Sequence, residues 1–283
     1  MRRPVDVQNP PAVQRARARA EGTRRTARTR PRDQRLTRLW ISSATVAVAI
    51  LLWEVAARTG VMDARFTSSP SGVVANLPWL VESDFRVHAG YTLYAITAAF
   101  GLSLVAGAAA GLVIGRVRLA RRLLDPLVTI GYTTPLTAFI PVVVMFLGLG
   151  ITSKIVIGLV GGVFPVLVNV AAGAGTVDPP LLRAARSFSV GRFQTYRHVI
   201  VPSVLPYAVT GARIGLGRVL IGVIITEMFG GSQYGLGLLL IRMGQSFRTD
   251  ELMLLVLVVG IAGTLTVGGL RSWERRMARW RAV

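Results

Sequence analysis

The sequence has no cysteine, two histidines and a single lysine, and these shortages exclude several kinds of site. Without cysteine there is neither a disulfide nor a thiolate metal ligand. His88 and His198 have no companion ligands, so the sequence predicts no metal site and no histidine-based catalytic centre. Lys154 does not follow a glycine-rich phosphate loop, so this chain cannot hydrolyse ATP through a P-loop. Paired carboxylates are also lacking, and we expect no enzymatic activity.

Apolar residues, in contrast, are abundant and grouped. They make up 52% of the 283 residues, whereas charged residues make up 16%, and the mean hydropathy is +0.54. The apolar blocks are close to the roughly 20 residues that a helix needs to cross a bilayer, so lipid is the expected solvent. The sequence therefore predicts an all-α integral membrane protein with six transmembrane helices, at about residues 39–57, 91–115, 127–149, 152–174, 204–230 and 252–270.

The net charge of +20 would suit a nucleic-acid-binding protein if the basic residues formed one surface. Six spans place both ends of the chain on one side, and that side holds 25 of the 33 lysines and arginines. The opposite loops hold six, with Lys154 counted among them, and Arg213 and Arg218 fall within the fifth span. This positive-inside bias predicts a multi-pass membrane protein with cytoplasmic N- and C-termini and no nucleic-acid partner.

The N-terminal 38 residues differ from the rest of the chain. They contain twelve arginines and few apolar side chains, so they cannot bury enough surface to offset the entropy of ordering. We expect a basic, disordered cytoplasmic tail over residues 1–38. The tail either contacts anionic lipid headgroups or serves only as a charge anchor that fixes the orientation.

Small residues recur at helix-contact spacing within the spans. Gly107, Gly111 and Gly115 are four residues apart, and Gly211 and Gly215 repeat this spacing in the fifth span. Such stripes let helix backbones approach closely in lipid. We expect them to pack helices within this chain rather than to form a dimer face.

The third span contains prolines and threonines that point to an interior path. Pro135 and Pro141 interrupt the helix, and Thr134 and Thr137 flank the first proline. Freed carbonyls at membrane depth are tolerated where protein or a water-filled cavity meets them, so this helix either lines a pathway or is simply kinked.

Three charged residues in or near the fifth span are further pathway candidates. Arg213, Arg218 and Glu227 lie where charge is unfavourable and normally faces the interior of a bundle. Either arginine would raise the positive potential of a pathway for an anion. The alternative is a structural pairing between helices, for instance with Glu54 or with backbone carbonyls.

The longest polar insertion between spans is Asp178 to Pro206, on the predicted cytoplasmic side. Asp178 is placed to cap a helix whose first residue is Pro179, and Gly191 is expected to end it. A second short helix is expected over 192–201. By its amphipathic pattern alone, the insertion is either an interfacial helix in the headgroups or a docking element for another protein.

The insertion resembles the coupling-loop signature of permease subunits of ATP-binding-cassette (ABC) importers, the EAA motif. Its consensus is EAA, followed by any three residues, a glycine, any nine residues and then I-x-L-P. Here Ala184 and Ala185 match the alanines, whereas Arg183 replaces the glutamate and Ser189 replaces the glycine. Val199, Val201 and Pro202 close the motif.

The resemblance extends over roughly residues 50–282, to importer permeases for nitrate, sulfonate, taurine and bicarbonate. Its other elements occur in the family's order: Trp53-Glu54, SPSG at 69–72, LGITSK at 149–154, residues 177–182, GARI at 211–214, Glu227-Met228, residues 235–238 and the closing WERRMARW.

This resemblance implies a six-helix type I ABC importer transmembrane domain with a cytoplasmic coupling helix, in a bacterial plasma (inner) membrane. The expected regions are the tail at 1–38, the first span and external loop at 39–86, an ABC transmembrane type-1 domain at 87–275 and a basic cytoplasmic C-terminus at 276–283. The ATPase-coupling residues implied are Arg183, Ala184, Ala185, Phe188, Ser189, Gly191, Arg192 and Pro202.

The resemblance also implies partners and a substrate class. We expect a second permease copy in a homodimer, cytoplasmic ABC ATPase subunits that hold the ATP and magnesium, an extracytoplasmic binding protein, and membrane lipid. The expected substrate is a small anion such as nitrate, a sulfonate or taurine. Two alternatives stay open: a neutral or heteroaromatic metabolite such as a vitamin precursor, and a self-contained secondary transporter.

Overall fold

A computed structural model describes residues 31–60, 63, 66–229 and 232–279 of the chain. The chain divides into two units, residues 1–61 and 62–283, which are described separately. Most of the predicted N-terminal tail, residues 1–30, and the last four residues of the C-terminal region lie outside the described residues.

The first unit contains one long helix, α2 (Pro31–Arg58). Its segment Trp40–Arg58 has a mean hydropathy of 1.7 and is apolar on every side, as a helix surrounded by lipid would be. Glu54 and Arg58, one turn apart, form an ion pair. The helix begins at Pro31, so residues 31–38 are helical, although the sequence places them in the disordered tail.

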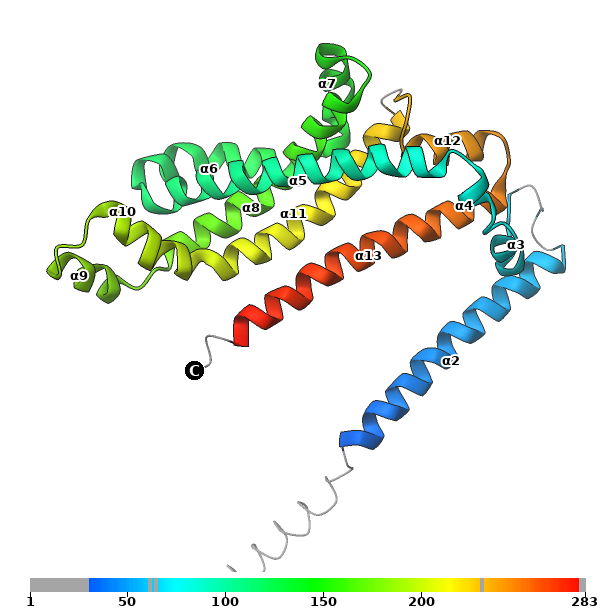
Figure 1. Cartoon of the computed structure of the whole chain (residues 1–283), viewed down its shortest axis with the longest axis horizontal. Coiled ribbons are helices and arrows are strands. Elements are labelled where there is room, and N and C mark those ends of the chain that lie inside the picture. Colours follow the sequence, from blue (N-terminus) through cyan, green and yellow to red (C-terminus); the bar gives the residue numbers. More distant parts are fainter. Residues whose placement is uncertain (1–30, 61–62, 64–65, 230–231, 280–283) are drawn as a thin grey trace, which may run out of the picture. The chain divides into compact units, whose positions relative to one another are not determined.

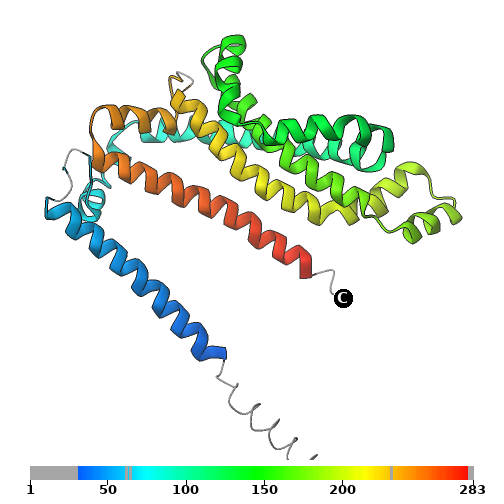
Figure 2. The ribbon, with the colours of Figure 1, turned by 180° about the vertical axis from the view of Figure 1, so that it is seen from behind.

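The centre of the second unit is a group of three helices that lie side by side: α5 (Phe85–Arg116), α8 (Ile151–Gly175) and α11 (Val201–Phe229) (Figure 1, Figure 2). The glycine stripes allow this packing. A Cβ atom at Gly107 would lie 2.7 Å from the Cβ of Val166, and one at Gly111 would lie 2.8 Å from the Cβ of Val170. The glycines of α5 therefore pack against α8 within the chain, as expected.

The last long helix, α13 (Thr249–Arg279), lies beside α11 and supplies the span Thr249–Leu270. Short helices surround its N-terminal end: α3 (Pro70–Ala75), α4 (Trp79–Glu82) and α12 (Leu236–Gln245). Ser69 caps α3 by accepting a hydrogen bond from the Gly72 amide at 3.0 Å. Gly235, which has a φ of 145°, directly precedes α12.

The predicted third span, 127–149, is not one straight helix. It consists of α6 (Arg118–Thr133), a 3₁₀ turn η1 (Leu136–Ala138) and α7 (Phe139–Leu147), and the two parts are bent by 87°. Pro135 has no amide proton and forces Thr134 out of the helical region, to a ψ of 131°. Pro141 lies in the first turn of α7, where proline is tolerated. The described residues hold five spanning helices and this bent pair, which makes up to six spans.

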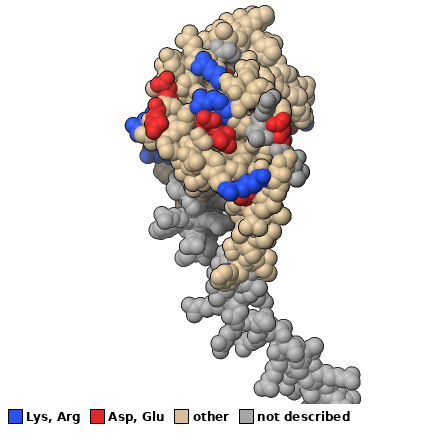
Figure 3. All heavy atoms as spheres, turned by 90° about the vertical axis from the view of Figure 1, so that its right-hand side faces the viewer, with Lys and Arg blue, Asp and Glu red and all other residues tan. Residues whose placement is uncertain are grey.

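The two ends of the second unit carry different charges. Figure 3 looks onto the end with α4 and α12, where side chains of both signs appear. The described residues there include Glu82, Asp84, Arg86, Arg242, Arg248, Asp250 and Glu251. The opposite end is dominated by arginines, namely Arg116, Arg118, Arg121, Arg122, Arg183, Arg186, Arg192 and Arg197, with Asp125 and Asp178.

Candidate functional site

The helix predicted after Asp178 is present as α9 (Pro179–Ser187), at the arginine-rich end between α8 and α11. It is held by two apolar side chains. Ala185 is buried, with 8% of its surface exposed, and Leu182 packs on the core cluster that contains Val177 and Ile200. Asp178 occupies the cap position and Pro179 the first turn, as expected, but the Asp178 side chain makes no capping hydrogen bond.

The opposite face of α9 is open. Arg183, Ala184 and Phe188 are exposed, and 82% of the Phe188 surface is accessible. Phe188, which follows the last residue of α9, thus lies outside the buried contact made by Leu182 and Ala185. A bare aromatic side chain beside arginines is a typical anchor for a protein partner.

The end of α9 explains the glycine of the EAA motif. Ser189, which stands at that position, has a φ of 55°, in the left-handed region that glycine adopts most easily. The Ser189 amide donates to the carbonyl of Arg186 and the Val190 amide to the carbonyl of Ala185, at 2.9 and 3.0 Å. This is a Schellman ending, with serine in the position that glycine usually occupies.

Two sequence expectations about this loop are wrong. Gly191 does not end α9, because the Schellman turn ends it at Ser187, and Gly191 instead precedes α10 (Arg192–Thr195). The second helix is not separate from the fifth span. It runs through a π-helical segment, Tyr196–Ile200, directly into α11, so that Arg192–Phe229 forms one 38-residue helical stretch. Gly191, Arg192 and Pro202 are exposed.

A second group of candidates meets at the break between α6 and α7. Leu136 inserts between α8 and α11 at two glycines: a Cβ at Gly161 would lie 3.0 Å, and one at Gly222 2.8 Å, from Leu136 Cδ2. Thr134 is partly buried, and its hydroxyl donates to the Ile130 carbonyl at 2.7 Å. Pro135, Thr137 and Pro141 are exposed.

The two arginines of α11 have different surroundings. Arg218 is exposed, and its Cζ atom lies 4.9 Å from the ring centroid of Tyr132, in a cation–π contact with the end of α6. Arg213 is partly buried and takes part in an interaction within the chain. The structure brings Arg218, Thr134 and the helix break together, and it places Arg213 more than one turn along α11 from them.

Glu227, the third charged candidate, is fully buried in a polar network at the other end of α11. Its carboxylate forms an ion pair with Lys154, at 3.1 Å, and accepts a hydrogen bond from the Gly237 amide at 3.0 Å. The Thr92 hydroxyl lies 2.8 and 2.9 Å from the two carboxylate oxygens. Lys154, 2% exposed, also donates to the Tyr234 carbonyl.

This network, called the Glu227 network below, joins α5, α8 and α11 to the segment that leads into α12. The Leu236 amide donates to the Thr92 hydroxyl at 2.9 Å, and His88 Nδ1 lies 2.9 Å from the Gly235 amide. Sequence reasoning missed the Glu227 network because Lys154 was counted among external loop residues. It also missed Tyr132, the aromatic partner of Arg218. A lone lysine within an apolar run was the signal that pointed to a buried partner.

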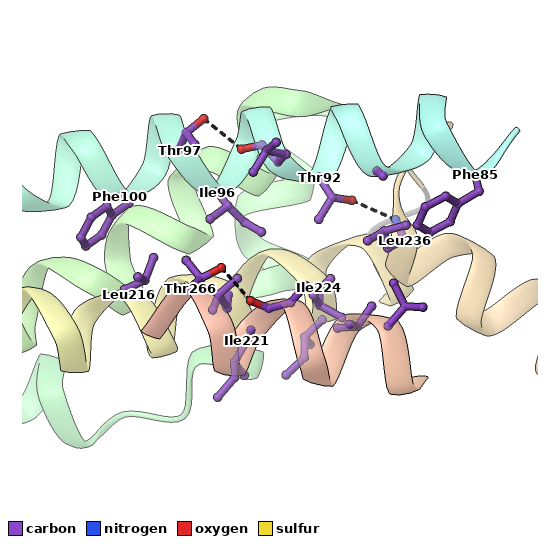
Figure 4. Close-up of a pocket in the computed structure, with 18 residues that line it drawn as sticks. Phe85, Thr92, Ile96, Thr97, Phe100, Leu216, Ile221, Ile224, Leu236 and Thr266 are labelled. Atoms are coloured by element: carbon purple, nitrogen blue, oxygen red, sulfur yellow. Dashed lines mark hydrogen bonds between the residues drawn. The ribbon is translucent and has the colours of Figure 1, made fainter. Parts of the chain in front are cut away.

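A large cavity lies between α5, α11 and α13 (Figure 4). It has a volume of about 630 Å³ and an almost entirely aliphatic and aromatic lining. Its threonine hydroxyls are engaged: Thr97 donates to Leu93 and Thr266 to Ala262, at 2.9 and 2.7 Å, and Thr92 belongs to the Glu227 network. The described lining therefore offers no charged group to an anion. Nor do the described residues hold a cluster of three metal-ligating side chains.

Curated proteins with similar sequences are transport permeases. The chain is 28% identical over 246 residues to the taurine transport system permease protein TauC of Escherichia coli (strain K12), which covers 85% of this chain and 89% of that protein. It is 28% identical over 236 residues to SsuC of Bacillus subtilis (strain 168), a permease named for aliphatic sulfonates transport, with 83% and 85% covered. It is 27% identical over 232 residues to the formylaminopyrimidine transport permease protein ThiX of Halalkalibacterium halodurans, with 82% and 92% covered.

A solved structure supports the fold. An inward-facing form of the MetNI methionine ABC transporter matches with a TM-score of 0.50 at 20% identity, over 65% of this chain and 95% of that one. The family model described as "Binding-protein-dependent transport system inner membrane component" matches residues 103–271. That range contains α8, α9, the helix break and α11. The chain therefore belongs to the family of binding-protein-dependent transport system inner membrane components, as its sequence resemblance indicates.

Proposed function

We propose that this chain is the permease subunit of an ATP-driven importer in a bacterial inner membrane. Two copies form the pathway, an extracytoplasmic binding protein delivers the substrate, and cytoplasmic ABC ATPase subunits hold ATP and magnesium. The chain itself contributes the path and the mechanical link. The shared family, the helical fold and the lack of a phosphate loop in the sequence support this division of labour.

The observation that carries the proposal is the exposed face of α9. A short helix held by Leu182 and Ala185 presents Phe188, 82% exposed, at the arginine-rich end of the bundle. An aromatic side chain left bare beside Arg183 fits insertion into a groove of a partner. In this arrangement Ala185 packs α9 against the helices of its own chain, while Ala184, Phe188 and Arg192 contact the ATPase.

The orientation follows from the charges of the two ends. The arginine-rich end with α9 faces the cytoplasm, because positively charged loops are retained there. The end with α4 and α12, where acidic and basic residues are mixed, then faces outward (Figure 3). Both chain termini lie on the cytoplasmic side, and the remaining apolar surface meets lipid and the second copy.

The proposed substrates are small organic sulfonates. Relatives named for taurine and aliphatic sulfonates cover most of this chain, and exposed Arg218 would favour an anion. A neutral heteroaromatic substrate is the second candidate, because a relative named for formylaminopyrimidine transport matches over a similar length. Uptake driven by an ion gradient through this chain alone would contradict the importer proposal.

Replacing Phe188 with aspartate tests the coupling role. We expect Phe188→Asp to weaken the ATPase contact, because a charged side chain would enter the apolar groove proposed above. ATP-driven uptake in proteoliposomes should fall at least about tenfold, and less ATPase should copurify with the permease. The thermal stability of the permease in detergent should stay unchanged, since Phe188 is exposed.

Leu77→Asp is the matched control, because Leu77 is an exposed apolar residue at the opposite end of the unit, between α3 and α4. It should retain the full complement of ATPase. Normal ATP-coupled uptake by Phe188→Asp would instead assign α9 to the membrane surface and reject its role as a coupling helix.

A further inference from the structure

Two features that lipid does not tolerate meet at one place in the second unit. The first is the non-helical backbone at Thr134 and Pro135, between α6 and α7. The second is the exposed guanidinium of Arg218 on α11. Open backbone and charge both persist at membrane depth only where they face protein or water. Because this chain leaves Arg218 exposed, their coincidence favours an aqueous path at this point.

The depth of Arg218 agrees with that assignment. It lies 17 residues after Val201 and 11 before Phe229, the ends of α11. At 1.5 Å per residue these are about 26 Å and about 17 Å along the helix, so Arg218 is well inside the hydrocarbon region.

The break is fixed to the bundle by packing. Leu136 lies against Gly161 and Gly222, where added Cβ atoms would approach its Cδ2 to 3.0 and 2.8 Å. Gly131 accommodates the ring of Phe164 in the same way. These contacts at glycines fix η1 and the end of α6. Tyr132, at the end of α6, is therefore held beside Arg218.

Arg218 differs from a structural membrane charge. Among the described residues it has no carboxylate within salt-bridge distance, whereas Lys154 is buried against Glu227 at 3.1 Å. The Tyr132 ring, 4.9 Å from Cζ, contacts one face of the guanidinium and leaves its edge of N–H donors for a ligand. Thr134 and Tyr132 line the same small cavity as Arg218.

We propose that Arg218, oriented by Tyr132, is a binding station for the sulfonate group of the substrate during its passage. The planar guanidinium fork donates two parallel hydrogen bonds to two sulfonate oxygens, which a lysine could not do. Contact with water keeps the binding weak enough for release, as transport requires. This inference rests on the proposed function and names the residue that selects its substrate class.

The test uses the complete importer, reconstituted in proteoliposomes with its ATPase and binding protein, and measures ATP-driven uptake of taurine and of ethanesulfonate. Arg218→Gln should lower the uptake rate about tenfold or more, since it removes a charge-assisted bond. Arg218→Lys should retain part of the uptake, and Tyr132→Phe most of it, because the ring remains. ATPase copurification and thermal stability should match those of the unsubstituted importer.

Arg122→Gln is the matched control: an exposed arginine of α6, outside the break, whose loss should leave uptake unchanged. Sulfonate uptake at the normal rate by Arg218→Gln would overturn the inference while the proposed function stands. If Arg218→Gln does not assemble, Arg218→Lys is the deciding variant. An unchanged KM for sulfonate uptake would reject the binding station, and a KM raised several-fold would support it. An importer that takes up neither sulfonate would overturn the proposed substrate class, and the station with it.

Discussion

The two ends of the α8–α11 pair are fastened in different ways. At the end with α12, Lys154 of α8 and Glu227 of α11 are buried together, with Thr92 and the Gly237 amide completing the carboxylate's hydrogen bonds. At the arginine-rich end the connecting helix α9 rests on the bundle through Leu182 and Ala185, and it leaves Phe188 bare. One end is closed by a satisfied polar network, and the other by a small apolar contact.

This difference indicates which end can move. A buried ion pair whose remaining bonds are filled tolerates little displacement, because any opening leaves charge uncompensated at low dielectric. An apolar contact is not directional and allows small shifts at little cost. We therefore expect the ends of α5, α8 and α11 next to α12 to act as a fixed point, and α9 to shift more easily.

The largest expected effect comes from breaking the Glu227 network. Glu227→Gln leaves the Lys154 ammonium, 2% exposed, without its counter-charge. We expect the free energy of unfolding in detergent, measured by steric trapping, to fall by about 3 to 5 kcal/mol. Adding Lys154→Met should recover part of this loss, because the buried charge is then absent.

Glu251→Gln is the control, since Glu251 pairs at 2.7 Å with Arg248, whose side chain is half-exposed. Its loss should amount to less than about 1 kcal/mol. Equal effects of Glu227→Gln and Glu251→Gln would mean that burial does not distinguish the network, and the proposed fixed point would be lost.

A smaller effect is expected from crowding the same network. In Gly237→Ala the added Cβ would lie 2.7 Å from the Cβ of Glu227 and would overlap the Ile224 carbonyl. Backbone and a buried side chain would have to shift, which costs about 1 to 3 kcal/mol. Gly244→Ala, in the same helix α12 but with its nearest atom 4.0 Å away, should be neutral in the same measurement. A neutral Gly237→Ala would show that the network is looser than its distances indicate.

Hydropathy and charge predicted the parts of this fold that depend on local sequence. The spans and the position of α9 between α8 and α11 both follow from apolar runs and from turn residues. The family assignment, which rests on ordered motifs, is confirmed as well. These features need no knowledge of which helices are neighbours.

The Glu227 network depends on such knowledge. Lys154 and Glu227 are 73 residues apart, and Thr92 is 135 residues from Glu227, so no periodicity within one helix connects them. The same holds for Tyr132 and Arg218, which come from α6 and α11. The sequence indicated only a kink at the place of the 87° bend for a related reason. The bend depends on space for the Leu136 side chain beside glycines of two other helices, α8 and α11.

The smallest expected effect concerns the apolar end. Ser189 holds a φ of 55° at the end of α9, which is unfavourable for a residue with a Cβ atom. Ser189→Gly should relieve that strain, and the greater freedom of glycine in the unfolded chain offsets part of the gain. We expect a net stabilisation of about 0.5 kcal/mol, seen as slower hydrogen exchange at the Ser189 and Val190 amides that close the Schellman turn.

The control is Ser187→Gly, inside the helix, which should instead speed exchange at these amides by removing a better helix former. Faster exchange in Ser189→Gly would mean that the serine hydroxyl, rather than the backbone, holds this turn, and that α9 is fastened more specifically than the contact of Leu182 and Ala185 implies.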